Sequence, residues 1–188
     1  MKIAVLALQG AFAEHEKALH RLGIETIELR KKQDLHTRFD ALILPGGEST
    51  VQGKLLKEFG MFEELKYRIE NGLPVMATCA GVILLAQTLV NDDRNYFKTF
   101  PIKVVRNAYG RQLGSFHQKG TLKDIGAFDM EFIRAPLIAS ASPDCTVLGT
   151  VKESIAAVRY QNQLAFTFHP ELTDDLAVHQ YFCQKMVH

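Results

Sequence analysis

The chain contains few cysteines, and no two of them have the spacing of a metal or redox motif. Its 188 residues include three, Cys79, Cys145 and Cys183, and none belongs to a CxxC pair. Three widely separated thiols cannot form the disulfide framework of a small secreted protein, and they lack zinc-ligand spacing. We therefore expect no metal and no cofactor.

An excess of charge of either sign is also missing. Lys and Arg number 22 against 21 Asp and Glu, which gives a net charge of +1. A chain so close to neutrality offers no electrostatic case for binding nucleic acid or an anionic membrane. With 47% hydrophobic and 23% charged residues, the composition is that of a globular protein, and the length suits a single domain spanning residues 1–188.

No apolar run has the character of a membrane span or a signal peptide. Residues 71–91 carry no charge, but Pro74, Thr78 and Gly81 interrupt them. The apolar run 3–8 near the N-terminus is shorter than the core of a signal peptide and is better explained as a first strand. We expect a cytoplasmic protein that does not enter the membrane.

Strand-like runs alternate with helical patterns in the first half of the chain, which predicts βαβ units and a largely parallel sheet. The predicted strands are 3–8, 24–29, 41–44 and 74–77, and the predicted helices are 14–22, 49–59, 61–71 and 80–90.

The second half consists mainly of short strand-like runs with few helical spans between them, so we expect some antiparallel pairs. These runs are 102–105, 115–122, 131–135, 146–151, 155–160 and 164–168. A last helix is expected to begin with Thr173 as its N-cap and to end near Lys185.

The segment around Cys79 has the pattern of a nucleophile elbow. An apolar strand precedes the cysteine, a helix follows it, and the small residues Ala77 and Gly81 stand two positions on either side. A buried cysteine that acts as a small apolar residue is the alternative, and this segment alone leaves the two about equally supported.

A second chemical feature stands at the end of the predicted strand 164–168. His169 follows this strand, and Glu171 lies two residues further on, so a carboxylate can hold an imidazole that acts as a base. A histidine at a strand end is more often structural when taken alone. The other six histidines lack comparable surroundings (His15, His20, His36, His117, His179 and His188), and for His179 and His188 we expect a solvated position.

A third feature is the pair Gly46 and Gly47 after the predicted strand 41–44. Glycines let the backbone come close to a ligand and present N–H groups to it, although a simple turn before a helix capped by Ser49 or Thr50 is the alternative. All three features follow predicted strands, and open α/β sheets bind ligands at that edge.

Taken together, these residues resemble the class I glutamine amidotransferases. Within that class the chain is similar, over nearly its whole length, to the glutaminase subunits of pyridoxal 5′-phosphate synthases. The matching segments are 8–10, 44–50, 78–81, 106–112, 132–136 and 168–173. The resemblance implies a three-layer α/β/α fold of the flavodoxin-like kind. Ala77 stands where the family usually has glycine, Val105 where it often has an acidic residue, and residues 91–101 do not follow the usual pattern.

The resemblance also implies roles for individual residues. Cys79 would be the nucleophile, His169 the base and acid, and Glu171 the group that orients His169. The N–H groups of Gly47 and Ala80 would form the oxyanion hole. The expected glutamine-binding residues are Gly46, Gly47, Glu48, Arg106, Ile133 and Arg134, of which the arginines suit a carboxylate.

The implied activity is hydrolysis of glutamine, with the ammonia passed to a synthase subunit that makes pyridoxal 5′-phosphate. The resemblance also implies an assembly of twelve glutaminase and twelve synthase subunits. Two alternatives stay open: a stand-alone Cys-His hydrolase acting on γ-glutamyl compounds, and a non-catalytic regulatory subunit.

Overall fold

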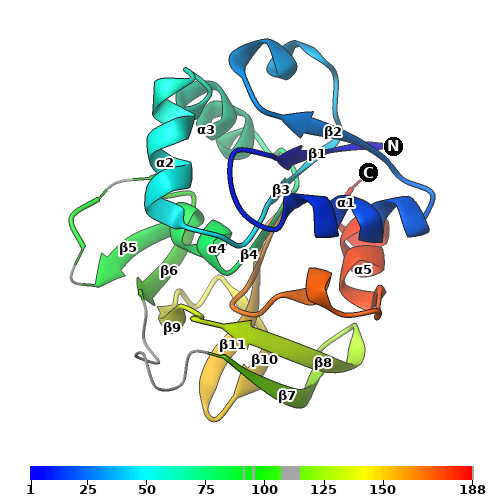
Figure 1. Cartoon of the computed structure of the whole chain (residues 1–188). Coiled ribbons are helices and arrows are strands. Elements are labelled where there is room, and N and C mark those ends of the chain that lie inside the picture. Colours follow the sequence, from blue (N-terminus) through cyan, green and yellow to red (C-terminus); the bar gives the residue numbers. More distant parts are fainter. Residues whose placement is uncertain (91, 95, 107–114, 188) are drawn as a thin grey trace.

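Residues 1–90, 92–94, 96–106 and 115–187 are described by a computed structural model of the chain. At the centre of this part lies a parallel sheet (Figure 1). Its strands, in spatial order, are β2 (Glu25–Leu29), β1 (Lys2–Leu6), β3 (Ala41–Leu44), β4 (Val75–Thr78) and β12 (Gln163–Phe166). This is the flavodoxin-like strand order. The predicted α/β fold with a mostly parallel sheet is therefore confirmed.

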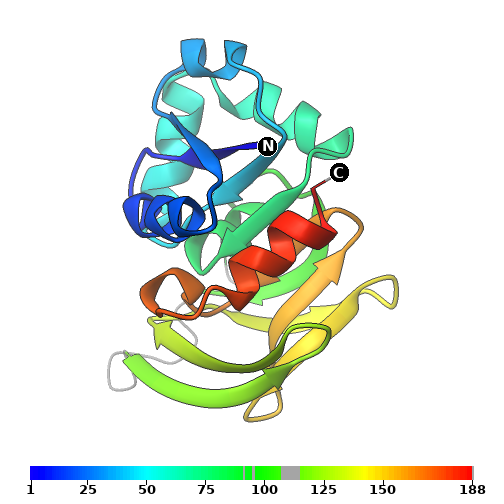
Figure 2. The same cartoon turned by 90° about the vertical axis from the view of Figure 1, so that its right-hand side faces the viewer.

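Helices cover both faces of the sheet, which gives the three layers. One face carries α1 (Phe12–Arg21) and α5 (Ala177–Lys185); the other carries α2 (Ser49–Glu58), α3 (Phe62–Glu70) and α4 (Ala80–Leu85) (Figures 1 and 2). Successive residues of β1 alternate between the layers, because side chains along a strand point to opposite faces. Ile3 and Val5 pack in the cluster that contains Leu19 of α1, whereas Ala4 and Leu6 pack in the cluster on the other face.

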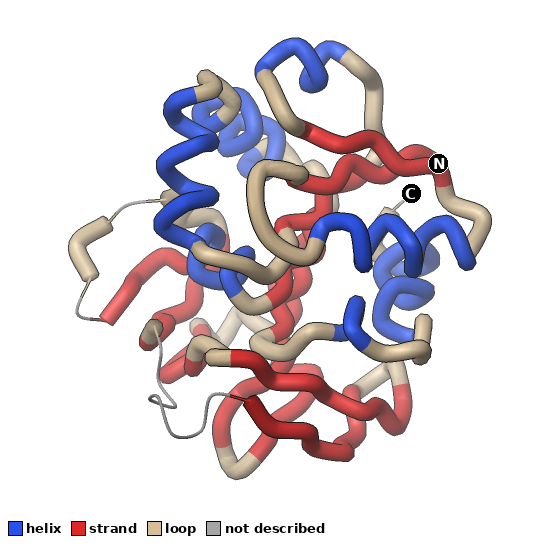
Figure 3. Tube along the Cα trace, viewed as in Figure 1, coloured by secondary structure: helices blue, strands red, loops and turns tan. Residues whose placement is uncertain are grey.

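The second half of the chain extends the sheet with further strands (Figure 3), and most of their pairs are antiparallel, as predicted. Beyond β12 follow β11 (Ser154–Tyr160), β9 (Leu137–Ala141), β6 (Phe100–Val105) and β5 (Ala86–Val90), while β10 (Thr146–Val151) also pairs with β11. The pairs β12–β11, β11–β9, β9–β6 and β11–β10 are antiparallel, and β5–β6 is parallel. A separate hairpin consists of β7 (Ser115–Leu122) and β8 (Gly126–Ile133).

The predicted helix 80–90 is wrong in its second half. Helix α4 ends at Leu85, and residues 86–90 form strand β5 beside β6. Alanine, glutamine and leucine in this stretch favour a helix locally. Pairing with a strand that lies 14 residues further along the chain (Ala86 with Phe100) outweighs that preference, and the sequence pattern does not reveal such a partner.

The predicted start of the last helix is also wrong. Thr173 is not its N-cap: the Thr173 hydroxyl donates to the Pro170 carbonyl (3.1 Å) and closes the short 3-10 helix η2 (Pro170–Leu172). Helix α5 begins at Ala177, whose N–H is bound by Asp175 Oδ1 at 2.8 Å. Strand β8 begins five residues earlier than predicted, and strand β9 and the 3-10 helix η1 (Lys32–His36) were not expected.

Four loops meet at the carboxyl edge of the parallel sheet, following β1, β3, β4 and β12. The first two come into contact because residue 10 is glycine. Gly10 has φ +103°, and a Cβ there would stand 1.9 Å from the Gly46 carbonyl oxygen, which accepts the Ala11 N–H at 3.0 Å. None of the helices in the part of the chain that the structure describes is long and apolar enough to cross a membrane.

Candidate active site

Cys79 stands on a strained turn between β4 and α4. Its backbone has φ 45° and ψ −100°, which is an uncommon conformation for a residue with a side chain. Gly81 allows the turn to pack against β3, because a Cβ there would lie 2.2 Å from the Leu44 carbonyl oxygen. This geometry is that of a nucleophile elbow, which lifts the thiol out of the strand and toward the sheet edge.

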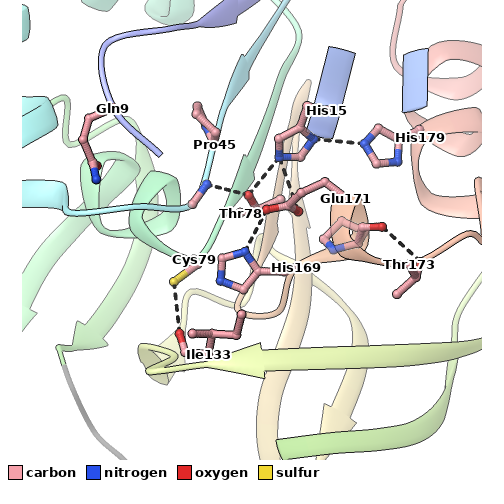
Figure 4. Close-up of polar contacts among 12 residues, drawn as sticks. Gln9, His15, Pro45, Thr78, Cys79, Ile133, His169, Glu171, Thr173 and His179 are labelled. Atoms are coloured by element: carbon pink, nitrogen blue, oxygen red, sulfur yellow. Dashed lines mark hydrogen bonds and ion pairs between the residues drawn. The ribbon is translucent and has the colours of Figure 1, made fainter. Parts of the chain in front are cut away.

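His169 lies between Cys79 and Glu171, three residues beyond the end of the neighbouring strand β12 (Figure 4). Its Nδ1 is 2.7 Å from Glu171 Oε1, and both side chains are buried. The carboxylate requires a proton on Nδ1, so Nε2 is left for the nucleophile. Nε2 makes no hydrogen bond within the described residues, and the Cys79 thiol donates instead to the Ile133 carbonyl, with a sulfur–oxygen distance of 3.8 Å.

The electrostatics of this pair favour an imidazolium. Burial lowers the pKa of His169, but hydrogen bonding and charge interactions with Cys79 and Glu171 outweigh burial and raise this pKa to about 10. The contact with Glu171 is the hydrogen bond to Nδ1 described above. A charged His169 favours a thiolate on Cys79 and has a proton to give to a leaving group.

A cavity of about 210 Å³ opens beside the elbow. Drug-sized ligands occupy pockets of roughly 300–1,000 Å³, so this cavity suits a smaller molecule of amino-acid size. Its lining consists of Gln9, Gly47, Glu48, Ser49, Cys79, Ala80, Ile83, Arg106, Ile133, Arg134 and His169. The cavity thus brings together the predicted site residues except Gly46 and Glu171, which lie behind its wall.

Gly46 supports the site from behind. Its N–H donates to Thr78 Oγ1 at 2.9 Å, and its α-carbon lies against the His169 ring. The Gly46 carbonyl points to Ala11, so in a trans peptide the Gly47 N–H points away from the 10–11 loop. Ala80 is the first residue of α4, and its N–H therefore has no acceptor within the helix. The oxyanion-hole roles of Gly47 and Ala80 stay predictions.

Two predicted arginines lie on the cavity wall, and each contacts an acidic residue. Arg106 Nη1 is 2.5 Å from Asp92 Oδ2, and Nη2 is 3.0 Å from Thr50 Oγ1. Arg134 Nη2 lies 3.3 Å from Glu48 Oε1 in a more exposed pair. Hydrogen bonds from Arg94 and Arg106 hold the pKa of Asp92 well below its usual range, although burial raises it.

Comparison with known proteins identifies the family of the chain. The pattern of the SNO glutamine amidotransferase family matches residues 5–188. The chain belongs to this family.

Named relatives agree with the family match. The pyridoxal 5′-phosphate synthase subunit PdxT of Desulfitobacterium hafniense (strain DSM 10664 / DCB-2) is 55% identical over 186 residues, which are 99% of this chain and 94% of the relative. The protein of the same name from Haemophilus influenzae (strain PittEE) is 49% identical over 185 residues, 97% of this chain and 96% of the relative.

One solved structure supports the same family, and a more distant one shares the fold. A crystal structure of a glutamine amidotransferase aligns with a TM-score of 0.92 at 43% identity over 97% of both chains. A glutamine amidotransferase from Thermotoga maritima shares the fold, with a TM-score of 0.62 at 14% identity over 96% of this chain and 82% of that one.

Two of the differences from the expected family pattern lie near the site. Ala77 is fully buried inside β4, two residues before the turn at Cys79. Asp92, from the segment that does not follow the family pattern, binds Arg106. Of the family segment 106–112, residues 107–112 lie outside the described residues.

The other two cysteines have surroundings that suppress reactivity. Burial raises the pKa of Cys183 to about 11 and also raises the pKa of Cys145. Both thiols therefore stay protonated near neutral pH and are weak nucleophiles. All three cysteines are free.

Two histidines were assessed wrongly from the sequence. The sequence predicts a solvated position for His179 and no site-like surroundings for His15, but both side chains are fully buried and His15 lies 3.4 Å from Glu171. Helical spacing was the available signal. His15 precedes Ala18 and Leu19 by three and four residues, and His179 precedes Phe182 and Cys183 by the same steps, so each shares its helix's buried face. His188 lies outside the described residues.

Cavity residues without a predicted role are Gln9, Ser49 and Ile83. Gln9 comes from the loop after β1, and its Oε1 accepts the Glu48 N–H at 2.6 Å. Among the described residues, no group of three or more His, Cys, Asp or Glu side chains is arranged to hold a metal ion.

Proposed function

We propose that this chain hydrolyses glutamine with Cys79, His169 and Glu171, and passes the ammonia to a pyridoxal 5′-phosphate synthase subunit. The chain is a glutamine amidotransferase by its family. One observation supports the catalytic assignment above all: the strained elbow and His169, backed by Glu171, line one wall of a cavity of amino-acid size.

The first half of the reaction is acylation of Cys79. Its thiolate attacks the side-chain amide carbon of glutamine, and the carbonyl oxygen becomes an oxyanion held by the N–H groups of Gly47 and Ala80. The C–N bond then breaks while His169 gives its proton to the leaving nitrogen. Ammonia departs, and a glutamyl thioester remains on Cys79.

The second half releases glutamate. His169, now neutral, takes a proton from a water molecule that attacks the thioester carbon. The C–S bond breaks, which restores the Cys79 thiolate beside an imidazolium. Glu171 keeps the imidazole in one orientation through both halves.

Charged side chains at the cavity mouth match the two charges of the amino acid. Arg106 and Arg134 suit the α-carboxylate, and Glu48 suits the α-ammonium group, while Ile133 supplies apolar wall. Gly46 acts indirectly, because it shapes the wall behind His169.

The synthase partner is inferred from relatives that are named as pyridoxal 5′-phosphate synthase subunits over nearly the same length. An assembly of twelve plus twelve subunits stays a prediction. So does a cytoplasmic location, which three free thiols support because a reducing compartment keeps them reduced. We also propose one domain over residues 1–188, because the sheet runs without a break from β2 to β5.

The test is to assay the purified chain with and without a candidate synthase subunit. Glutamate release and glutamine-dependent formation of pyridoxal 5′-phosphate are measured for the native chain, Cys79→Ala, and the controls Cys145→Ala and Cys183→Ala. We expect only Cys79→Ala to lose both activities. Full glutaminase turnover by Cys79→Ala would overturn the assignment.

Two further outcomes identify the alternatives. Strong activity on γ-glutamyl peptides without the synthase subunit would indicate a stand-alone hydrolase. A reactive glutamine analogue that fails to label Cys79 in the assembled complex would indicate a non-catalytic subunit.

A further inference from the structure

Two buried histidines outside the triad form a polar pair behind it. His15 comes from α1 and His179 from α5, and neither side chain has any exposed surface. His15 Nδ1 lies 3.0 Å from His179 Nε2 (Figure 4). Burying two imidazoles between a sheet and its helices is unfavourable unless their nitrogens have partners, and apolar residues would fill this space more simply.

The partner on the other side of His15 is the carboxylate of Glu171. His15 Nε2 lies 3.4 Å from Glu171 Oε2, and both side chains are completely buried. Glu171 Oε1 is engaged by His169 at 2.7 Å, whereas Oε2 has no hydrogen-bond partner among the described residues. His15 is thus the polar group that faces the second oxygen of this carboxylate.

Charge decides which ring nitrogen of His15 carries the proton. Burial and the neighbouring His179 and His169 lower the pKa of His15 well below its usual value, and burial lowers the pKa of His179 to about 4. Both rings are therefore neutral near pH 7, with one proton each. An ionised carboxylate favours an N–H over a lone pair, which places the His15 proton on Nε2.

This tautomer gives a consistent set of hydrogen bonds. His15 Nδ1 becomes the acceptor, and His179 Nε2 donates to it. His179 Nδ1 then carries a lone pair rather than a proton, and it is the atom without a partner. The opposite tautomers would bury an unpaired N–H on His179 and turn a lone pair of His15 toward Glu171.

The same nitrogen of His15 also contacts the nucleophile's strand. Nε2 lies 3.2 Å from Thr78 Oγ1, the residue before Cys79, and Thr78 Oγ1 in turn accepts the Gly46 N–H at 2.9 Å. One buried N–H therefore faces two fixed points of the site: the carboxylate that orients His169 and the hydroxyl that holds the glycine loop.

We propose that His15 is a positioning residue of the glutaminase site, with His179 holding it in the required tautomer. His15 fixes the second oxygen of Glu171 and the Thr78 hydroxyl, and so sets His169 relative to Cys79 and to the Gly46–Gly47 loop. The inference rests on the proposed function, because it assigns His15 to the triad's support.

The test compares His15→Leu, which removes both nitrogens, with His15→Gln, whose amide nitrogen reaches the Nε2 position. His20→Leu is the matched control, since His20 lies on the same helix but is exposed and contacts only Thr26, at 2.9 Å, among the polar partners described for it. Glutaminase kcat and KM are measured in the complex with the synthase subunit. The pH dependence of Cys79 alkylation by iodoacetamide is measured on the isolated chain.

We expect His15→Leu to lower kcat about 10- to 100-fold, the range for a hydrogen bond to a charged group, with KM within about twofold. The midpoint of Cys79 alkylation should move to higher pH, because a less well-held Glu171 supports the His169 imidazolium less. His15→Gln should recover much of the loss, and His20→Leu should change nothing. A folded His15→Leu with native kcat and alkylation profile would overturn the proposal.

A measurement on the unaltered chain keeps the proposal testable if His15→Leu does not fold. Nitrogen-15 chemical shifts of the His15 ring report which nitrogen is protonated, and we expect Nε2. A proton on Nδ1 would overturn the proposal. Cys79→Ala in the same assays distinguishes a failure of the proposed function from a failure of the role proposed for His15. Turnover retained by Cys79→Ala refutes the proposed function, whereas turnover retained by His15→Leu alone refutes this inference.

Discussion

The α-carbon of Gly46 packs against the imidazole ring of His169 with no space for a side chain between them. A Cβ on Gly46 would stand 2.3 Å from His169 Cε1 and 2.8 Å from Nδ1, and 3.4 Å from the Cβ of Cys79. The imidazole cannot yield, because Glu171 holds Nδ1 and the backbone N–H of His169 is bound to the Glu131 carbonyl at 2.8 Å.

Gly46→Ala is therefore expected to displace His169 and to lower glutaminase kcat by at least about 100-fold, since small misplacements of a catalytic group are costly. Steady-state kinetics in the complex measure the loss. Gly120→Ala is the control, because its Cβ would meet only the flexible end of Met130. Native kcat in a folded Gly46→Ala would show that the ring has room to move.

Gly81→Ala should act on stability as well as activity. Its Cβ would lie 2.2 Å from the backbone oxygen of Leu44, and a strand backbone cannot move aside as a side-chain end can. We expect the free energy of unfolding to fall by about 1–3 kcal/mol, as in other overpacked sites. Urea titrations followed by circular dichroism measure this change, and a midpoint equal to that of the native chain would contradict it.

Asp92→Ala should weaken glutamine binding more than it slows the chemistry. Asp92 holds Arg106 at the cavity wall, and without it the guanidinium keeps only its contact with Thr50 there. We expect KM for glutamine to rise about 10-fold with kcat within about twofold, the behaviour of a binding contact. Asp93→Ala, an exposed neighbour, should behave as the native chain does. An unchanged KM in Asp92→Ala would remove Arg106 from glutamine recognition.

The free energy of unfolding should be highest near pH 6.5, because different buried histidines lower it on the acidic and on the alkaline side of that pH. Unfolded histidines titrate near that pH. Burial lowers the pKa of His15 and brings that of His179 to about 4, so at acidic pH the unfolded chain binds more protons and stability falls with falling pH. The pKa of His169 is raised to about 10, so above pH 6.5 the folded chain keeps a proton on His169 that the unfolded chain has lost. Stability therefore falls with rising pH to the extent that Cys79 keeps its own proton, because a thiolate at Cys79 would cancel the extra proton.

Each proton changes the free energy of unfolding by at most about 1.4 kcal/mol per pH unit. Urea titrations from pH 4 to pH 9 are carried out on the native chain, His179→Phe and His169→Ala. They measure the loss of stability below pH 6.5 and the loss above it separately. The difference from the native chain should appear on the acidic side for His179→Phe and on the alkaline side for His169→Ala. Parallel curves for all three proteins would refute the assignment.

Local sequence was sufficient wherever short-range sterics and the repeat of apolar residues control the structure. The apolar runs of β1, β3 and β4 indicated covered parallel strands, and the structure confirms them. Small residues around Cys79 indicated the sharp turn that its backbone angles show. His169 and Glu171 are two residues apart, so their contact needs only the turn at Pro170.

Long-range pairing decided what the local pattern missed. Residues 86–90 favour a helix by composition but form β5, because β6 offers them a partner for their backbone groups. Asp92 binds Arg106, which lies 14 residues further along the chain. The residue just before Arg106 is Val105, at a position where the family often has an acidic residue, so the local sequence did not indicate which carboxylate pairs with Arg106.

The sequence by itself indicated the proposed nucleophile, its proposed base and the parallel sheet that carries them, because residue size, apolar periodicity and two-residue spacing act locally. Only the tertiary structure decided the environment of His15 and His179, which are separated by 164 residues and bond to each other at 3.0 Å. The fold removes both rings from water and places them behind Glu171. Burial and the nearby Glu171 carboxylate decide whether each imidazole is charged and which groups it contacts, and no local sequence pattern encodes either.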